Sequence, residues 1–555
     1  MTLPRVTLLA AVAGALGWSA GALAQPPETP GADVPPVAPE AEPDTPEDPE
    51  AEEDPAQPND EDGAGWWDEG GAGVPPEVAA EPGRGAPDGL RPEADPEPAA
   101  GEDSGRDDGA DASAEVEEEE DEEDATGRFV FGSYGRVVAA SDLDGQSGRD
   151  ADIVSHGPRI DEGTYAELEL RREDDLRIMS SRVVATLALA GPLFHFDGAF
   201  EDRFAVRNLF LELSDVGAEG LHLWAGSRMV RGDDLYLFDF WPMDNLNLVG
   251  GGLRYAHEEL FEAGLSVGLA RPDDPFQRQV IDTMPVAGFE PDEVVLLDRP
   301  RLVIAAKGTW FALGRGDTGL KLSLYGEVHD LSAGERQDAA GVAMQLPADS
   351  GWVFGAQVGG WLSERNAFVN LFLRYARGLG AYDPLGVPFR TGSVIDTERA
   401  EELLVALSAN FEWEMVGAQL GAWVRRFRDA DPSLLERGAL AEGALSIRPY
   451  VWLGEHLGLA VEGGYQALET TALDERTGEP VRGSIWKFGL IPFVSPFGRG
   501  TYTRPHLRII YALTRRDAGA RALYPDRDPR SLAENSTEHF LGVGAEWWFD
   551  SSSYQ

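Results

Sequence analysis

The sequence contains no cysteine, so neither a disulfide framework nor a thiolate metal site is available to this chain. Histidine is also scarce, with 8 residues scattered over 555 positions. An enzymatic site needs a nucleophile, a base and an orienting group that converge, and His506 lies in an arginine-rich segment without a serine partner. The segment Asp142–Gly145 lacks the later ligands of a calcium loop and is interpreted as a turn. We therefore expect no catalytic residues, no metal site and no cofactor.

Long apolar runs are missing after the first 24 residues, because no later segment approaches the roughly 18 uninterrupted apolar residues of a membrane helix. The start of the chain differs. A charged Met1–Arg5, an apolar Val6–Leu23 and an Ala22-Leu23-Ala24 cleavage site predict a secretory signal peptide over residues 1–24. The mature chain is then expected to begin at Gln25 and to leave the cytoplasm.

Branched apolar residues are almost absent from residues 25–127, which hold 36 acidic and 3 basic residues and carry most of the net charge of −52. Such a segment cannot bury enough surface to offset the entropy of ordering it. We interpret it as a disordered periplasmic arm, and its Glu117–Asp124 run as a solvated spacer. The pair Trp66-Trp67 is either a docking motif or two exposed aromatics. This acidity disfavours nucleic-acid binding.

The remaining residues, 128–555, alternate between polar and apolar side chains. In Thr164–Leu170, a strand puts Tyr165 and Glu167 on one face and Ala166 and Leu168 on the other. Three further segments repeat the alternation: Val130–Val137, Tyr502–Tyr511 and Leu541–Phe549. A soluble sheet alternates too, but a membrane barrel turns its polar face into a lumen. Without spanning helices, a membrane location requires a closed barrel.

The length of residues 128–555 predicts the size of such a barrel. At about ten residues per strand plus loops, it holds about 16 to 18 strands. Leu302–Phe311 and Leu320–Val328 are predicted to pair as a hairpin, and the G-x-G-x-x-G match at 314–319 between them is interpreted as a turn because no helix follows it. Three longer polar stretches are expected to be extracellular loops: Ser141–Gly163, Arg271–Arg299 and Arg515–Glu538. The predicted fold is an all-β transmembrane antiparallel barrel; a large soluble β-protein is the alternative.

The sequence resembles the maltoporin, or sugar porin, family of Gram-negative outer membranes. The motifs run in family order: Tyr134-Gly135-Arg136, Arg159, Thr164–Leu168, Leu223–Arg228, Asp234, Asp239-Phe240-Trp241, Asp244, Arg448-Pro449-Tyr450, Glu462–Tyr465, Thr503-Arg504-Pro505 and Glu546–Phe549. The resemblance implies an 18-stranded barrel, a homotrimer in outer-membrane lipid, and a passive channel in which a linear oligosaccharide slides along an aromatic track.

Carried over position by position, the resemblance assigns two sets of residues. The track aromatics are Tyr134, Tyr165, Trp241, Tyr502 and Trp548. The polar pore and constriction residues are Arg136, Arg159, Glu167, Arg207, Arg231, Asp234 and Asp239, with Gly232 as the alternative to Arg231. A further track aromatic is expected near Leu371 and Phe372. Phe200 is the candidate for an aromatic that reaches a neighbouring subunit.

Two other functions are compatible with the same residues. A general diffusion porin needs the pore charges without the aromatics. A barrel could also serve as an anchor that holds the acidic arm in the periplasm. The sequence thus favours a maltodextrin-type channel and leaves an unselective porin and a membrane anchor as alternatives.

Overall fold

The computed structural model describes residues 127–551, apart from residues 177, 191–202, 258–259, 283–292, 314–315, 339–340, 384–385, 389–393, 431–437, 474–477 and 524–534. The predicted signal peptide, the acidic arm with Trp66-Trp67, and Phe200 lie outside the described residues. The domain boundaries proposed for the chain at residues 24 and 127 therefore stay predictions.

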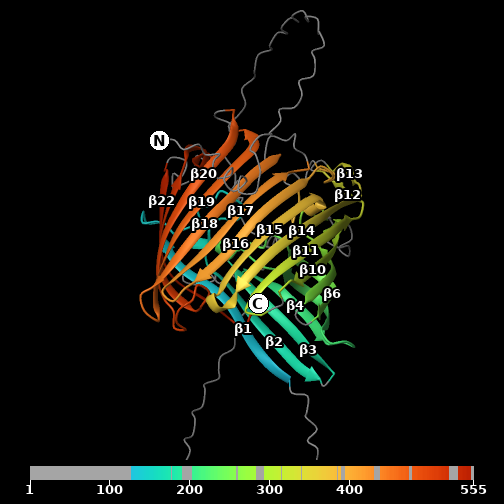
Figure 1. Ribbon diagram of the computed structural model, residues 1–555. Coiled ribbons are helices and arrows are strands. Elements are labelled where there is room, and N and C mark those ends of the chain that lie inside the picture. Colours follow the sequence, from blue (N-terminus) through green and yellow to red (C-terminus); the bar gives the residue numbers. More distant parts are fainter. Residues whose placement is uncertain are drawn as a thin grey trace, which may run out of the picture. The chain divides into compact units, whose positions relative to one another are not determined.

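The described residues form a closed antiparallel barrel of 18 strands, which confirms the predicted fold class (Figure 1). The strands are, in chain order, β1 (Gly127–Ser141), β2 (Tyr165–Leu176), β3 (Met179–Ala190), β4 (Arg203–Ser214), β5 (Leu221–Arg231), β6 (Asn245–His257), β7 (Phe261–Ala270), β10 (Arg301–Phe311), β11 (Thr318–Leu331), β14 (Asp349–Leu362), β15 (Ala367–Gly378), β16 (Glu401–Glu412), β17 (Val416–Arg428), β18 (Ala439–Trp452), β19 (Leu457–Leu473), β20 (Pro480–Val494), β21 (His506–Arg516) and β22 (Thr537–Phe549). Each strand pairs with its neighbours in chain order, and β22 pairs back with β1. In the part of the chain that the structure describes, closure leaves the barrel sheet itself without an edge strand.

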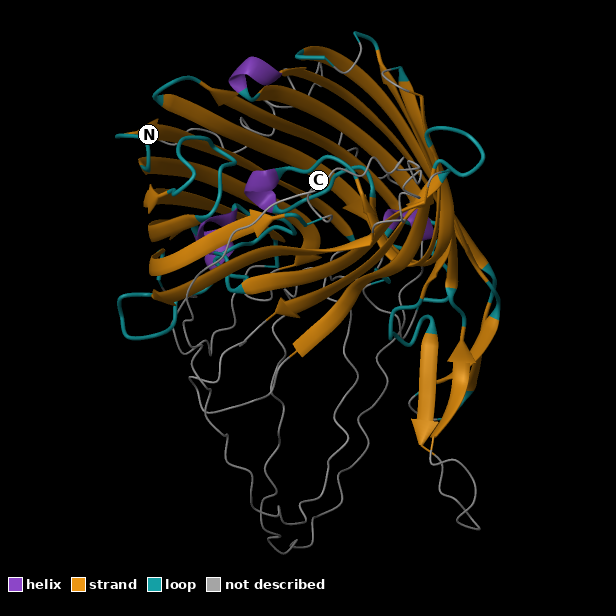
Figure 2. Cartoon of the chain, turned by 90° about the horizontal axis from the view of Figure 1, so that it is seen from below, coloured by secondary structure: helices purple, strands orange, loops and turns teal. Residues whose placement is uncertain are grey.

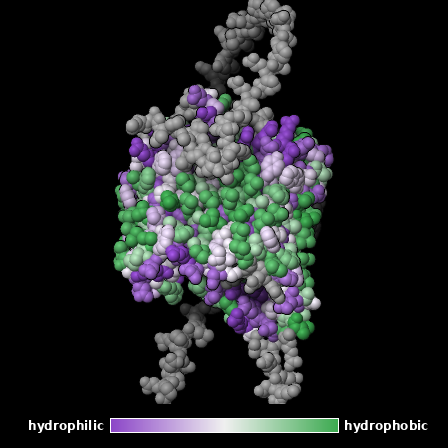
Figure 3. Space-filling model, viewed as in Figure 1, coloured by the Kyte–Doolittle hydropathy of each residue, from purple (hydrophilic) through white to green (hydrophobic). Residues whose placement is uncertain are grey.

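The outer surface follows the predicted alternation. On β2, Leu168 and Leu170 are 41% and 51% exposed, whereas Glu167 and Glu169 are buried inside. Figure 3 shows the result as an apolar band across one face, with hydrophilic residues above and below it. Among the helices of the described residues, none is long and apolar enough to cross a membrane.

Two short hairpins stand apart from the barrel sheet. They are β8 (Arg278–Asp282) with β9 (Glu293–Asp298), and β12 (Gly334–Gln337) with β13 (Ala343–Leu346). The polar stretch Arg271–Arg299 is thus partly a hairpin, a detail that its loop assignment missed. Its strands are too short to cross a membrane, which takes about 9 to 11 residues per strand.

One strand prediction needs correction. The segment Tyr502–Tyr511 was expected to be a strand throughout, but β21 begins only at His506. Residues 502–505 are irregular, and the Arg504–Pro505 peptide bond is cis. Proline cannot donate to a sheet ladder, so the strand begins after it.

Two loops fold into the barrel. The first inner loop, residues 142–164, includes η1 (Arg159–Asp161), and the second inner loop, residues 232–244, includes η3 (Tyr236–Phe238). In Figure 2, loops and helical turns lie within the ring of strands. The remaining helical turns of the described residues are η4 (Ser363–Arg365), η5 (Leu379–Ala381) and α2 (Ala518–Arg521).

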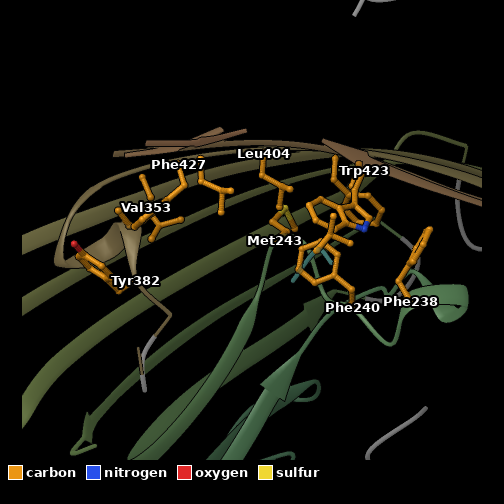
Figure 4. Close-up of a cluster of buried hydrophobic side chains, with 14 of the residues drawn as sticks. Phe238, Phe240, Met243, Val353, Tyr382, Leu404, Trp423 and Phe427 are labelled. Carbon is orange, nitrogen blue, oxygen red and sulfur yellow. The ribbon is translucent and has the colours of Figure 1, made fainter. Parts of the chain in front are cut away.

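Apolar packing fastens the second inner loop to one side of the barrel. Phe238, Phe240 and Met243 belong to one buried cluster with Leu404 on β16 and Trp423 on β17 (Figure 4). Close packing of this kind fills the space between loop and wall. The open part of the lumen therefore lies along the other strands.

Ion pairs tie both inner loops to the barrel wall. Lys487 on β20 lies 3.0, 2.5 and 2.6 Å from carboxylate oxygens of Asp150, Asp152 and Asp161. Two further pairs tie the second inner loop to β10 and β11: Lys307 with Asp244 at 2.6 Å, and Lys321 with Asp233 at 2.7 Å. The loops are thus held by charge as well as by apolar contact.

Lys487→Ala is expected to destabilise the barrel by on the order of 3 kcal/mol, because it leaves three carboxylates of the first inner loop without their shared cation. Urea unfolding in phospholipid vesicles measures the change. Arg482→Ala removes the exposed pair with Glu469, in which the side chains are 67% and 40% exposed, and should change stability little. Equal effects of the two substitutions would contradict the role given to Lys487.

Candidate pore constriction

A row of five aromatic rings runs across the inner wall, here called the aromatic row. Its order is Tyr165 on β2, Tyr134 on β1, Trp548 on β22, Tyr502 before β21, and Phe368 on β15. Successive ring centres are 6.0, 6.5, 6.5 and 6.1 Å apart. The strand register explains the middle of the row, since Tyr134 is paired directly with Trp548. Strands and loops from different parts of the chain thus contribute one series of neighbouring rings, in which Tyr134 is enclosed at 1% exposure.

The fifth aromatic ring of the row is not one of the two residues, Leu371 and Phe372, near which it was expected. Phe372 faces inward at 1% exposure and Leu371 outward at 40%, so of that pair the phenylalanine is the lumen residue. Phe372, however, belongs to the apolar cluster under the second inner loop. The ring that contacts Tyr502 is Phe368, four residues earlier on the same strand.

The second inner loop places a tyrosine on the row that the sequence reasoning missed. The ring of Tyr236 is 6.0 Å from that of Trp548 and 5.3 Å from that of Tyr502. Its hydroxyl donates to Glu546 at 3.0 Å and accepts from Arg504. An aromatic two positions after Asp234 in the predicted constriction segment was the available signal.

Trp241, the constriction aromatic expected from the resemblance, lies in the same loop beside Arg231. The guanidinium carbon of Arg231 is 3.7 Å from the centre of the Trp241 ring, and its Nε donates to Asn245 at 2.8 Å. This contact is a close cation–π arrangement. Arg231 therefore places a basic group against Trp241, and its correspondence to the family arginine stays a prediction.

Arginines surround the outer part of the row. Arg159 and Arg136 donate to the Tyr134 hydroxyl at 2.5 and 3.1 Å. Arg136 and Arg207 each lie 5.4 Å from the centre of the Tyr165 ring. The guanidinium groups thus hold the rings in place by hydrogen bonds and by cation–π contacts.

Glu167 joins two of the predicted residues. It accepts a hydrogen bond from Arg207 at 2.9 Å and another from the Tyr165 hydroxyl. The carboxylate is buried at 0% exposure of the residue. A buried carboxylate needs such partners, and here they fix the orientation of Tyr165.

The two aspartates of the second inner loop have opposite electrostatic surroundings. Enclosure in the lumen disfavours the charge of Asp239, but Arg159 and Arg136 outweigh this effect and lower its pKa. The two arginines lie 4.0 and 3.7 Å from its carboxylate. For Asp234, burial and then repulsion from Asp239 raise the pKa to about 7. The constriction therefore combines a permanent charge with one that titrates near neutrality.

The structure brings the predicted residues into one region. A cavity of about 840 Å³ is lined, among others, by Tyr134, Arg159, Arg231, Asp234, Trp241, Tyr502 and Trp548. The other five, Tyr165, Arg136, Glu167, Arg207 and Asp239, contact these or one another. Asp142 accepts backbone hydrogen bonds from Asp144 and Gln146, both at 2.9 Å, in the predicted turn. Among the described residues, no three His, Asp or Glu side chains are placed to hold a metal ion.

A closed barrel with an apolar outer band, and with charged loops folded into its lumen, defines the class of outer-membrane channels. A family model described as LamB porin matches residues 129–549. The chain belongs to the LamB porin family, which confirms the resemblance drawn from the sequence motifs. It is accordingly an outer-membrane channel protein.

Similar solved structures include OmpT of Vibrio cholerae, with 10% identity and a TM-score of 0.36, covering 76% of this chain and 98% of that chain. OccD3 (OpdP) of Pseudomonas aeruginosa has 9% identity and a TM-score of 0.39, covering 76% and 91%. DcaP of Acinetobacter baumannii has 10% identity and a TM-score of 0.39, covering 76% and 97%. The comparison with curated proteins found no match.

Asp234 is expected to make the ion selectivity of the channel depend on pH. As the pH rises through about 7, its carboxyl loses a proton and adds a negative charge to the constriction. The permeability to potassium relative to chloride should therefore rise between pH 5.5 and pH 8.5. Reversal potentials in a KCl gradient measure the ratio.

The matched variant is Asp234→Asn, which keeps the size of the side chain and removes the titration. This variant should remove the rise in the potassium-to-chloride permeability ratio near pH 7. The dependence of the ratio on pH at more acidic values should stay as in the wild type. An unchanged profile in this variant would show that another group controls the selectivity.

Proposed function

We propose that the protein is a passive channel for facilitated diffusion of oligosaccharides of the maltodextrin type, which slide along the aromatic row. The observation that carries this proposal is the continuity of the row. Five rings follow one another at 6.0 to 6.5 Å, from the end of the barrel with the first inner loop to the short turn before Phe368. A pore that only conducts ions has no use for such a surface.

The physical basis is the two-sided character of a pyranose ring. Its C–H faces are apolar and stack on an aromatic face without a fixed register, so the sugar gains contact area and still shifts along the row. Its hydroxyls lie at the ring edge, where they need donors and acceptors that replace water. Arg136 and Arg207 lie against the Tyr165 ring at the edge of the row, remain partly exposed, and offer charge-assisted hydrogen bonds.

Tyr236 sets the width of this path. With its ring centre 6.0 Å from that of Trp548, the two rings are in contact and no sugar fits between them. A passing oligosaccharide therefore moves through the cavity beside Tyr236, which Tyr502 and Trp548 also line. Contacts with each ring must stay weak, as rapid permeation requires.

Maltodextrins are expected to block the single-channel KCl current at millimolar concentration. Trp548→Ala should weaken this block about tenfold, since loss of one stacking contact is worth about 1 kcal/mol beyond the area that it buries. The matched control is Trp486→Ala, because Trp486 faces outward and is 47% exposed. Absence of block, together with no effect of Trp548→Ala, would refute the sugar track and favour an unselective porin.

We also propose that the channel is a homotrimer, as the family resemblance implies, and that residues 25–127 form a periplasmic arm behind a signal peptide. On this proposal, the mature N-terminus is Gln25. Deletion of residues 25–127 should leave conductance and sugar block unchanged, because all residues of the aromatic row lie after residue 127. N-terminal sequencing and bilayer recordings test both points. A loss of sugar block on deletion would instead give the arm a part in transport.

A further inference from the structure

Three arginines project from the wall β3–β6 into the same cavity that the aromatic row lines. They are Arg182 on β3, Arg228 on β5 and Arg254 on β6. Their side chains are 28%, 23% and 50% exposed, so each still reaches the lumen. None of these arginines contacts a ring of the aromatic row in the contacts given above.

The charge of this cluster is only partly balanced. Arg182 and Arg228 share a single carboxylate, that of Glu212, at 2.8 and 2.6 Å, with one oxygen each. Arg254 lies 3.6 Å from Glu262 and 3.4 Å from His222. A guanidinium carries five donors, so each arginine retains donors for a further acceptor.

The neighbouring lysines provide the contrast. Lys307 on β10 and Lys321 on β11 line the same cavity, but each has its own aspartate, Asp244 or Asp233. Their charges are matched one to one. The unmatched positive charge of this wall therefore lies at the arginines of β3–β6.

Aromatic packing fixes the orientation of the central arginine. The guanidinium carbon of Arg228 is 4.5 Å from the ring centre of Phe210 and 5.4 Å from that of Trp224. These two rings pack edge to face at 6.5 Å and are buried at 5% and 7% exposure. A planar guanidinium held in this way is preorganised to bind an oxyanion with two parallel hydrogen bonds.

We propose that Arg182, Arg228 and Arg254 form an anion-binding station, and that the transported oligosaccharides carry acidic groups, either carboxylates or sulfate esters. This inference rests on the proposed function, because the sugar rings still stack on the aromatic row. Arg182 and Arg254 also line a second cavity of about 550 Å³, together with Ser180, Ser181 and the carboxylates of Glu173, Asp174 and Asp175. The station thus lies where the two cavities adjoin, between the lumen beside the row and a more acidic cavity.

Glu212 keeps the station weak. It competes for the same donors as the ligand, so an acidic group is attracted to the arginines but is not held. Removal of this carboxylate by Glu212→Gln should therefore strengthen binding of an acidic ligand. A purely structural role of Glu212 predicts the opposite result, because the two arginines would lose their shared partner.

The experiment uses the full-length protein in planar bilayers and compares three blockers of equal chain length: a neutral maltodextrin, an oligogalacturonate and a sulfated maltodextrin. We expect at least one acidic blocker to bind about tenfold more tightly than the neutral one at low salt. The difference should shrink as KCl is raised, because salt screens the exposed guanidinium groups. The acidic blocker with the higher affinity identifies the anionic group.

The double variant Arg182→Gln and Arg228→Gln should lose this tenfold preference and keep the maltodextrin block, whereas Glu212→Gln should increase the preference. The charge control is Arg271→Gln, which removes an exposed arginine paired with Asp298 after β7. This substitution should change neither the preference for the acidic blocker nor the block by maltodextrin. If the double variant does not assemble, Glu212→Gln remains an independent test.

Any of three results would overturn the proposal of an anion-binding station. These are acidic blockers that bind no better than maltodextrin, an equal loss of affinity for acidic and neutral blockers in the double variant, and a weaker block by acidic blockers in Glu212→Gln. Failure of the proposed function has a different signature. In that case maltodextrin does not block the wild-type channel at all, whatever the acidic blockers do.

Discussion

The carboxylate of Glu546 holds together the parts from which the constriction is built. It is 1% exposed and receives Arg504 at 2.7 Å, Arg508 at 3.1 Å and the hydroxyl of Tyr236 at 3.0 Å. Arg159 of the first inner loop lies 3.7 Å away. A buried charge is tolerated only when it is paired and fully hydrogen-bonded. Both inner loops and the wall at β21 and β22 are therefore positioned by one charged group.

One side of the lumen is filled by apolar side chains, and the other side holds an open cavity. On the side of β15–β18, aromatic and aliphatic side chains of the inner loops fill the space and give the loops a fixed place. On the side of β1–β11, charged side chains line a cavity. The permeating molecule thus meets flat rings on one wall and guanidinium groups on another. This asymmetry makes a narrow path out of a barrel that is wide enough for an open channel.

Strand periodicity predicted much of this arrangement. Because successive side chains of a strand point to opposite faces, the polar and apolar pattern fixes which residues face the lumen. Tyr165 and Trp548 lie inside as expected for that reason. The same periodicity does not encode depth along a strand, so Phe368 and Phe372 have equal parity although only Phe368 contacts Tyr502. Tyr236 lies in a helical turn of a loop, where no periodicity applies. The sequence motifs therefore indicated the family and the faces, while the contacts between loops and wall required the structure.

The aromatic row crosses the seam of the barrel. Tyr134 belongs to the first strand and Trp548 to the last, and they face each other only because β1 and β22 pair. These residues are 414 positions apart in the chain, as are Trp547 and Ser133, which share a hydrogen bond across the same seam. A chain that inserts without its last strand lacks Trp548, the ring that joins the two halves of the row. Completion of the barrel and creation of the binding path are one event, so an incompletely assembled protein has no partly functional pore.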